Sequence, residues 1–478
     1  MADIPEYIDG VPNICGQEDV IAQAQADGPV FLGESKIDFK SIKSAFAVAL
    51  HMQQPLIPAG GDDLQTAALI SNLKHMMDNQ HTGDNHNAPV FHWCYKRIGE
   101  FVPQLVDEGF EPRVMLDYAG CLLHGLRDMG LHDVIESLQR VTCEPRYRHC
   151  VEWLGCPWSH AVAPSTPVQD YRLQVSAWRH HFASIFGVEA LRRVKGFSPA
   201  EMALPNHPDV FYEFVKSLKD NGYTWVLVQE HTIELADTGY GIEQRHIPHK
   251  LVAKNSKGES ISITAIIKTQ GSDTKLVAQM QPYYEAKSMS RWELAGKQIP
   301  PLVAQIGDGE NGGVMMNEFP GMFQQAMRES TRTDTPAMNA SEYLEHLEQM
   351  GITEDDFPVA QPSMQKRIWD RFEAAAGPEK LQEVIEELKN ENDGFHMDGG
   401  SWTNDLSWVN GYENVLGPMD KVSAAFAEKY IQTNTPTSDP QFRKALYYLL
   451  VSQTSCYRYW GQGAWTDYAR EICRRAGL

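Results

Sequence analysis

The chain has 478 residues, of which 42% are hydrophobic and 22% are charged. This composition is typical of a soluble globular protein with a substantial core, and it excludes a disordered chain and a membrane protein. There are 42 Lys and Arg residues against 63 Asp and Glu, a formal net charge of −21. This charge disfavours nucleic acid and anionic membranes as partners and favours a neutral or cationic one.

The eight cysteines are scattered along the chain and form no CxxC pair, which predicts reduced thiols rather than disulfides or zinc ligands. A secretory leader has a basic segment followed by an apolar one, and the opening MADIPEYIDG has neither. No later stretch offers the ~18 uninterrupted apolar residues of a spanning helix. We therefore expect a cytoplasmic protein.

Seven short runs rich in apolar and β-branched residues alternate with stretches of helical period. Such alternation is typical of β/α units around a parallel sheet, either closed into a barrel or doubly wound. The sixth run also suits a β-hairpin with its turn at Asn255–Gly258. The predicted strands are Ser44–Leu50, Arg113–Tyr118, Val151–Leu154, Arg193–Phe197, Thr224–Val228, Ser260–Lys268 and Leu302–Ile306.

Helices are expected between the strands, for example over Tyr171–Ile185 and Val210–Asp220, the second introduced by Pro208. After about Arg328 the strand pattern ends, and the rest of the chain predicts helices separated by turns. These helices are Ser341–Met350, Ser363–Ala376, Glu379–Asn390, Pro418–Tyr430 and Pro440–Ser455.

The polar, Pro-containing segment Ser330–Ala340 suits a connection between two domains. We therefore expect an N-terminal extension over residues 1–40 and a catalytic (β/α) barrel over residues 41–330. An α-helical domain over residues 341–478 would follow and complete the substrate cleft.

In a (β/α) barrel the chemistry gathers at the carboxyl ends of the strands, so the residues that follow each apolar run are the candidates. Carboxylates, histidines and a tryptophan occur there, which suits a sugar site better than a phosphate site. The residues at these predicted ends include His51, Asp117, Trp158, His160, Glu201, Glu230 and Asp308.

Glu201 and Asp308 are the carboxylates that a glycosidase mechanism would need. Such an enzyme keeps one carboxyl ionised and one protonated, and retention of configuration requires them about 5–5.5 Å apart. Glu201 follows a Pro-containing loop, and Asp308 lies between two glycines that allow close approach of a sugar ring. Each residue alone also fits an ordinary role, as a helix-terminal carboxylate or a solvated turn.

Five spaced segments together resemble glycoside hydrolase family 57, the group of α-amylases, 4-α-glucanotransferases and α-glucan branching enzymes. His51–Pro55 is similar to the family's HxHQP, with Gln53 in place of the second histidine. Gly196–Glu201 ends in the glutamate that matches the family's nucleophile, and Gly307–Gly313 resembles the DGExFG segment with the general acid/base aspartate. The remaining two segments are the loop ending at His160 and Gly400–Trp408.

The resemblance implies an incomplete seven-stranded (β/α) TIM-like barrel followed by an α-helical domain. It implies a retaining enzyme that acts on α-1,4-glucosidic bonds of an α-glucan or maltooligosaccharide through a covalent glycosyl-enzyme, without a cofactor. Glu201 would be the nucleophile and Asp308 the general acid/base. Gln53 and the missing aromatic residue before Gly313 leave linkage and chain-length preference open, and the residues do not decide between hydrolysis, transglycosylation and branching.

The same resemblance names candidate substrate-binding residues. His51 and His160 would donate hydrogen bonds to sugar hydroxyls, although a histidine bonded within the core is the plain alternative. The tryptophans would stack on glucose rings, and core packing explains each of them equally well. The full set is His51, Gln53, Trp158, His160, Glu230, Trp402, Trp408 and Trp460.

Two other functions compete with this interpretation. A metal-dependent polysaccharide deacetylase or mannosidase also uses a sevenfold barrel, but Gln53 is a poor ligand where such an enzyme would need a carboxylate. A glucan-binding protein that has lost catalysis would keep the cleft. The histidines 75, 81, 86 and 92 suggest a metal site at first sight, but their spacing does not share a helix face, and we expect a loop there.

Overall fold

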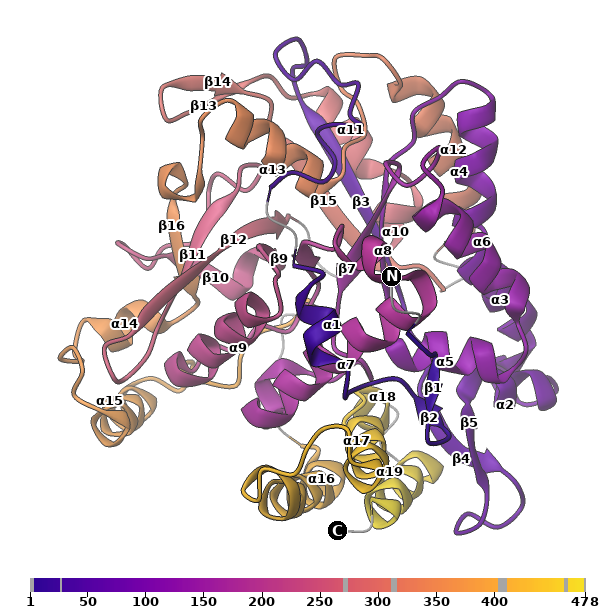
Figure 1. Cartoon of the computed structure of the whole chain (residues 1–478). Helices are drawn as coiled ribbons and strands as arrows, with labels where there is room; N and C mark the ends of the chain where they lie inside the picture. The colour runs from indigo at the N-terminus through magenta and orange to yellow at the C-terminus, as the bar shows by residue number, and fades with distance from the viewer. Residues whose placement is uncertain are drawn as a thin grey trace.

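The computed structural model describes residues 4–25, 28–269, 274–310, 316–402, 411–459 and 463–476. Its centre is a closed barrel of seven parallel strands in the order β12, β15, β3, β6, β7, β8 and β9, with β9 pairing back to β12 (Figure 1). The predicted barrel and all seven of its strands are confirmed. They are β3 (Ala45–Met52), β6 (Val114–Tyr118), β7 (Val151–Gly155), β8 (Gly196–Phe197), β9 (Trp225–Gln229), β12 (Ser260–Lys268) and β15 (Leu302–Asp308).

The sixth strand, β12, is both a barrel strand and half of a hairpin. Its first half pairs antiparallel with β11 (His249–Lys254), and its second half pairs parallel with β9. The sheet then continues from β11 to β16 (Val359–Pro362) and β10 (Ile233–Leu235). The expectation of helices alone after residue 328 was wrong at β16. A segment of four residues is too short for its periodicity to predict a strand. The conformation of β16 is decided by its pairing with the edges of β10 and β11.

Side-chain alternation along the strands separates the barrel interior from the helix-covered outside. On β3, Ala47 and Ala49 belong to the interior cluster, whereas Val48 and Leu50 pack outward with the surrounding helices. Because the period of a strand is two, His51 continues the inward-facing set at the carboxyl end. The strand pattern thus delivers polar residues to the inner rim.

Helices surround the barrel, and the predicted helices over Tyr171–Ile185 and Val210–Asp220 are confirmed within α7 and α9. The helices of this part are α3 (Ala88–Lys96), α4 (Ile98–Asp107), α5 (Gly120–Asp128), α6 (His132–Cys143), α7 (Val168–Phe186), α9 (Pro208–Asp220), α11 (Gln281–Lys287) and α12 (Phe319–Ser330). The shorter elements are β1 (Tyr7–Ile8), β2 (Val11–Pro12), α1 (Glu18–Ala22), β4 (Leu56–Gly60), β5 (Ala68–Ser71), α2 (Asn72–Asp78), η1 (Gly83–Asn87), η2 (Ala163–Ser165), α8 (Val188–Leu191), η3 (Ala200–Met202), η4 (Glu230–Thr232), α10 (Thr274–Ala278), β13 (Trp292–Leu294) and β14 (Lys297–Ile299).

The amino end of the barrel is closed by α13 (Ala340–Gln349), which was predicted over Ser341–Met350. The Ser341 amide and hydroxyl bond to Glu152 on β7, and the Ser341 hydroxyl also accepts from the Trp225 indole on β9. These contacts tie the start of α13 to two barrel strands.

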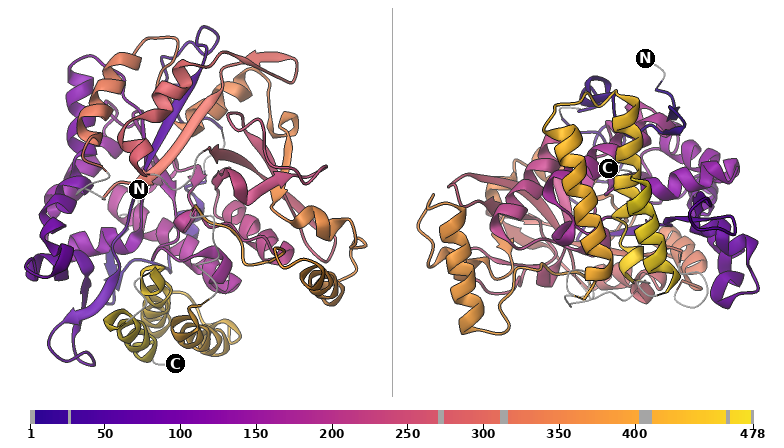
Figure 2. Two further views of the ribbon diagram at one scale, coloured as in Figure 1. Left: turned by 180° about the vertical axis from the view of Figure 1, so that it is seen from behind. Right: turned by 90° about the horizontal axis from the view of Figure 1, so that it is seen from below.

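The rest of the C-terminal region is largely helical, as predicted, and α16, α17 and α19 pack together as a bundle (Figure 2). Two expectations need correction. The helix expected over Ser363–Ala376 is only α14, and Ala375, with φ of 62°, cannot continue it. Pro418 lies inside α16 because burial of its neighbours Val415 and Met419 outweighs the missing hydrogen bond.

These C-terminal elements are η5 (Glu354–Asp356), α14 (Gln365–Trp369), α15 (Pro378–Glu391), α16 (Glu413–Phe426), η6 (Ala427–Ile431), α17 (Pro440–Ser452), α18 (Cys456–Tyr459) and α19 (Ala464–Arg475). Across the described ranges, no helix combines the length and apolar character needed to cross a membrane.

Candidate active site

Three neighbouring strands bring His51, Asp117 and Asp308 together at the carboxyl end of the barrel. Strand register places His51 of β3 opposite Asp308 of β15 on one side and opposite Asp117 of β6 on the other. His51 Nδ1 lies 2.9 Å from Asp117 Oδ2, and both side chains are buried. Asp117 therefore fixes the orientation of the His51 ring.

His51 carries a positive charge at neutral pH. Burial alone would lower its pKa, but the adjacent Asp117, helped by Asp308 and Glu310, raises the pKa to about 10. A charged His51 bonds to Asp117 through Nδ1–H and keeps a second donor at Nε2–H. That Nε2 atom is buried and has no hydrogen-bond partner among the described residues.

His160 comes from the loop after β7 and stacks on His51, with ring centroids 4.6 Å apart. Burial, together with the charges of His51 and Arg458, holds the pKa of His160 well below its usual value, so the ring is neutral. Its Nδ1 lies 2.7 Å from Ser455 Oγ, and its Nε2 is buried without a partner in the described part of the chain.

Glu201 follows β8 in a short turn with left-handed backbone, at φ of 59°. Such a backbone conformation is unfavourable for residues other than glycine, and it is often found at functional sites. The Trp402 indole donates to Glu201 Oε2 at 2.9 Å, and the Ser455 hydroxyl donates to Oε1 at 3.3 Å. Both oxygens are therefore oriented by the C-terminal region.

The protonation states along this chain of contacts follow from these bonds. Since Ser455 gives its proton to Glu201, its oxygen accepts from Nδ1–H of the neutral His160. His160 Nε2 is then an acceptor, next to the donor at His51 Nε2. The stacked pair thus presents one donor and one acceptor, the pattern that suits sugar hydroxyls.

The charge of Asp308 acts on Glu201. Burial, followed by the charge on Asp308, raises the pKa of Glu201 to about 7, although His51, Trp402 and Ser455 oppose the shift. Burial also raises the pKa of Asp308, against the effect of His51. Two partly buried carboxyls that share one positive neighbour favour a state with one proton between them.

Glu310 holds the loop that carries Asp308. The backbone amide of Gln53 donates to both Glu310 oxygens, at 2.8 and 3.1 Å, and the Tyr95 hydroxyl donates to one of them at 3.4 Å. The Gln53 side chain contacts Cys456 Sγ through Nε2. The backbone amide of Gln53 therefore holds Glu310, and its side chain connects the end of β3 to the C-terminal region.

Sequence comparison identifies the family to which these residues belong. Residues 47–328 match the sequence profile of glycosyl hydrolase family 57, a range that includes His51, Glu201 and Asp308. The chain is a member of glycosyl hydrolase family 57. A separate search of curated proteins finds no match.

Solved structures of low sequence identity are similar to this family 57 chain. A 4-α-glucanotransferase from Thermococcus litoralis is 16% identical with a TM-score of 0.49. The match covers 86% of this chain and 55% of the glucanotransferase chain. A GH57-type branching enzyme from Pyrococcus horikoshii is 13% identical with a TM-score of 0.48, covering 91% and 88%. The α-amylase AmyC from Thermotoga maritima is 11% identical with a TM-score of 0.49, covering 91% and 92%. This chain thus spans only 55% of the length of the glucanotransferase.

The other predicted site residues of this family 57 member have different surroundings or lie outside the described residues. Trp158 is fully buried and donates to His181 Nδ1 at 3.0 Å, so its ring packs in the core and is not open to a sugar. Glu230 pairs with Arg245 at 2.9 Å. Trp408 and Trp460 lie outside the described residues, as does the end of the predicted motif at residues 311–313.

Sequence reasoning missed several residues that contact the site from the C-terminal region. Ser455 bonds to Glu201, Cys456 contacts Gln53, and the charge of Glu201 raises the pKa of the buried Arg458 against the effect of burial. Their signal is the polar run that follows the apolar helix α17, which ends at Ser452 although the predicted helix extends to Ser455. Asp117 was noted at a strand end but was not assigned to the site.

The loop predicted between the histidines, over residues 79–89, was wrong in part, because it contains the 3-10 turn η1 and the start of α3. No group of three or more His, Cys, Asp or Glu side chains within the described ranges is arranged to hold a metal ion.

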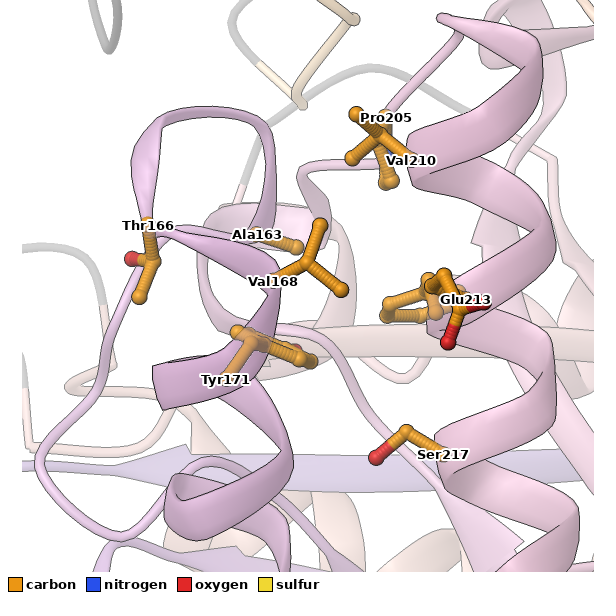
Figure 3. Close-up of a pocket in the computed structure, with 9 residues that line it drawn as sticks. Ala163, Thr166, Val168, Tyr171, Pro205, Val210, Glu213 and Ser217 are labelled. Carbon is orange, nitrogen blue, oxygen red and sulfur yellow. The ribbon is translucent and has the colours of Figure 1, made fainter. Parts of the chain in front are cut away.

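A small cavity between α7 and α9 is not part of the site (Figure 3). Tyr171 and Ser217 point into it from opposite helices, and neither hydroxyl has a hydrogen-bond partner in the described structure (Figure 3). Its volume of about 10 Å³ is that of one water molecule, so a sugar does not fit.

Proposed function

We propose that this family 57 protein is a retaining glycoside hydrolase or transglycosylase that acts on α-1,4-glucosidic bonds of α-glucans or maltooligosaccharides. The observation that carries the proposal is the pair of partly buried carboxyls, Glu201 and Asp308, on one barrel rim beside a donor and an acceptor imidazole. Family membership and the resemblance of five sequence segments support it.

In the first step, Glu201 attacks the anomeric carbon and forms a glycosyl ester, while the glycosidic C–O bond breaks. Asp308 gives its proton to the departing oxygen. Glu201 must be ionised for this step, and the charge on His51 and the hydrogen bonds from Trp402 and Ser455 favour that state. Asp308 must be protonated, and its buried position favours that state.

In the second step, the Asp308 carboxylate takes a proton from the acceptor hydroxyl, whose oxygen attacks the anomeric carbon and releases Glu201. A water acceptor gives hydrolysis, and a sugar hydroxyl gives transglycosylation. Both outcomes use the same two carboxyls, so the acceptor depends on the surroundings of the rim.

The two imidazoles of this mechanism would bind the hydroxyls of the sugar that is cleaved. His51 Nε2–H would donate to one hydroxyl oxygen, and His160 Nε2 would accept from a hydroxyl proton. A ligand that satisfies both atoms removes the cost of burying them unpaired, about 1–3 kcal/mol for each.

The decisive experiment is azide rescue with an aryl α-maltooligosaccharide, whose good leaving group does not need an acid. The variant Asp308→Ala should transfer the sugar to azide with retention and yield the α-glycosyl azide, because azide attacks the covalent intermediate. The variant Glu201→Gly should yield the β-glycosyl azide by direct displacement. The opposite products would overturn the two assignments.

A parallel measurement separates an enzyme from a binding protein. Wild-type protein should convert amylose and maltoheptaose, and Glu201→Gln should lose this activity while it is still retained on an α-glucan affinity gel. Retention of wild-type protein without any conversion would instead support a binding protein. New 1,6 branches, longer 1,4 chains or free reducing ends among the products would identify the acceptor.

We also propose a cytoplasmic location. All eight cysteines are free thiols, and those near the site, such as Cys456 and Cys121, are not paired with each other. Free thiols in this number suit a reducing compartment. Fractionation of the source cells with an antibody against the chain would test this location.

A further inference from the structure

We propose that a shallow cavity between α3 and α12 is a second binding subsite for the glucan, with Trp93 as its platform. This inference rests on the proposed function, because it names a further contact of the same polymeric substrate. The cavity has a volume of about 520 Å³, within the range of small-molecule sites. Pro89, Val90 and Trp93 of α3 line it, together with Arg97, Met316 and Pro320.

Trp93 is held in place from behind yet remains open to solvent. The Arg97 guanidinium lies 5.4 Å from the centre of the indole, and Phe101 meets the ring edge-on at 6.1 Å. Even so, 39% of Trp93 is exposed, and the neighbouring Val90 is 38% exposed. A ring fixed in this way offers a flat apolar surface with little entropy left to lose, which suits the C–H face of a pyranose.

These two side chains are unusual on this surface. Within the described residues, only seven large hydrophobic side chains are exposed, and Val90 and Trp93 are the two that line a common cavity. The other five, among them Tyr240 and Val359, come from distant parts of the chain. Single exposed apolar residues need no explanation, but a pair in one concave site marks a binding surface.

Arg97 adds a polar contact to the apolar platform. It lines the cavity although only 1% of it is exposed, and its Nε atom has no hydrogen-bond partner in the described structure. A buried donor without a partner costs about 1–3 kcal/mol, which a ligand oxygen can offset. An exposed aromatic ring beside a buried donor suits a neutral sugar, and the chain's net charge of −21 disfavours an anionic ligand.

Protein contacts connect the lining of the cavity to the residues that follow Asp308. Arg97 Nη2 donates to the carbonyl of Gly309, the residue that follows Asp308, at 2.8 Å. On the same helix as Trp93, Tyr95 donates to Glu310. One helix therefore serves both places, so a glucan chain held at Asp308 has a second contact site nearby. A second contact on a polymer raises affinity through effective concentration without a change in chemistry.

Affinity electrophoresis in gels that contain glycogen tests this site directly. Wild-type protein should be retarded, and Trp93→Ala should raise the apparent dissociation constant about 3- to 10-fold, the share expected of one aromatic contact. Trp93→Phe keeps a ring and should restore most of the retardation. Val90→Glu leaves the buried face intact and should weaken retardation through charge and bulk in the cavity. Tyr240→Ala removes a 74% exposed aromatic residue elsewhere and serves as the matched control.

The outcomes separate this inference from the proposed function. If wild-type protein converts amylose but Trp93→Ala and Val90→Glu are retarded as strongly as wild type, the subsite is wrong and the catalytic proposal stands. If retardation depends on Trp93 but amylose is never converted, the subsite stands and the catalytic proposal fails. If Tyr240→Ala weakens binding as much as Trp93→Ala, or wild-type protein is not retarded at all, the subsite is overturned.

Discussion

The two ends of the barrel differ in whether their buried charged and imidazole groups have hydrogen-bond partners. At the amino end, Arg113 forms two hydrogen bonds with Glu342 at 2.9 and 3.2 Å, and its third nitrogen donates to Pro112. Both oxygens of Glu152 accept from Ser341. At the carboxyl end, the Nε2 atoms of His51 and His160 are equally buried but bond to nothing in the described structure.

This difference separates a region built for stability from one built to bind. At the amino end, the paired charges of Arg113 and Glu342 attach α13 to the strands and are satisfied within the fold. Unpaired donors and acceptors at the other end lower stability unless a ligand completes them. Substitutions at the two ends should therefore affect different measurements, and the following predictions run from the largest expected effect to the smallest.

Asp308→Asn should abolish most activity with little effect on stability. Loss of the general acid/base costs a factor of about 10²–10⁴ in kcat on amylose. Asn resembles the protonated form of Asp308 that burial favours, so the midpoint of urea unfolding should change little. A clear fall of the midpoint would place Asp308 among the residues that stabilise the fold.

Arg113→Met should show the reverse behaviour at the amino end. Glu342 would be left buried without its partner, at a cost of about 3–5 kcal/mol in the free energy of unfolding, while kcat per folded molecule stays unchanged. The double variant Arg113→Met, Glu342→Leu should recover most of that stability. Loss of activity in the correctly folded Arg113→Met variant would contradict the assignment of stability to one end and binding to the other.

Asp117→Asn should lower the pKa of His51 from about 10 toward its ordinary value. Because the folded pKa is raised, the charge of His51 stabilises the fold fully below about pH 6.5, and this contribution is lost as the pH rises through about 10. The variant should lose about 1.5–3 kcal/mol at pH 6 and almost nothing above pH 10. NMR titration of His51 and urea unfolding at both pH values would test it.

Ser455→Ala should have the smallest effect, about 10-fold or less in kcat/KM, the loss of one hydrogen bond. Glu201 must be ionised, and its pKa of about 7 places the acid limb of the pH profile near neutrality. The bond from Ser455 favours the ionised form, so its loss should move this limb to higher pH. Asp308 favours the same direction, whereas the charge of His51 and the bond from Trp402 oppose it. Ser455→Thr keeps the hydroxyl and should leave the acid limb of the pH profile at its wild-type position. A pH profile that does not move would exclude Ser455 as a positioning residue for Glu201.

Local pattern alone predicted the seven barrel strands and placed His51, Glu201 and Asp308 at one rim. Strand periodicity of two is a property of neighbouring residues, so it can be read from the chain, and parallel strands in a barrel must present their carboxyl ends together. The same reasoning showed that β12 suits a hairpin, and the structure uses both pairings of that strand.

Tertiary structure decided what local pattern does not contain. Ser455 and Trp402 reach Glu201 from more than 200 residues away, and β16 becomes a strand only through pairing with β10 and β11. Trp158 was a plausible sugar platform by type and position, yet packing against the core buries it completely. Burial and hydrogen-bond partners depend on contacts between segments distant in sequence, so only the folded chain assigns them.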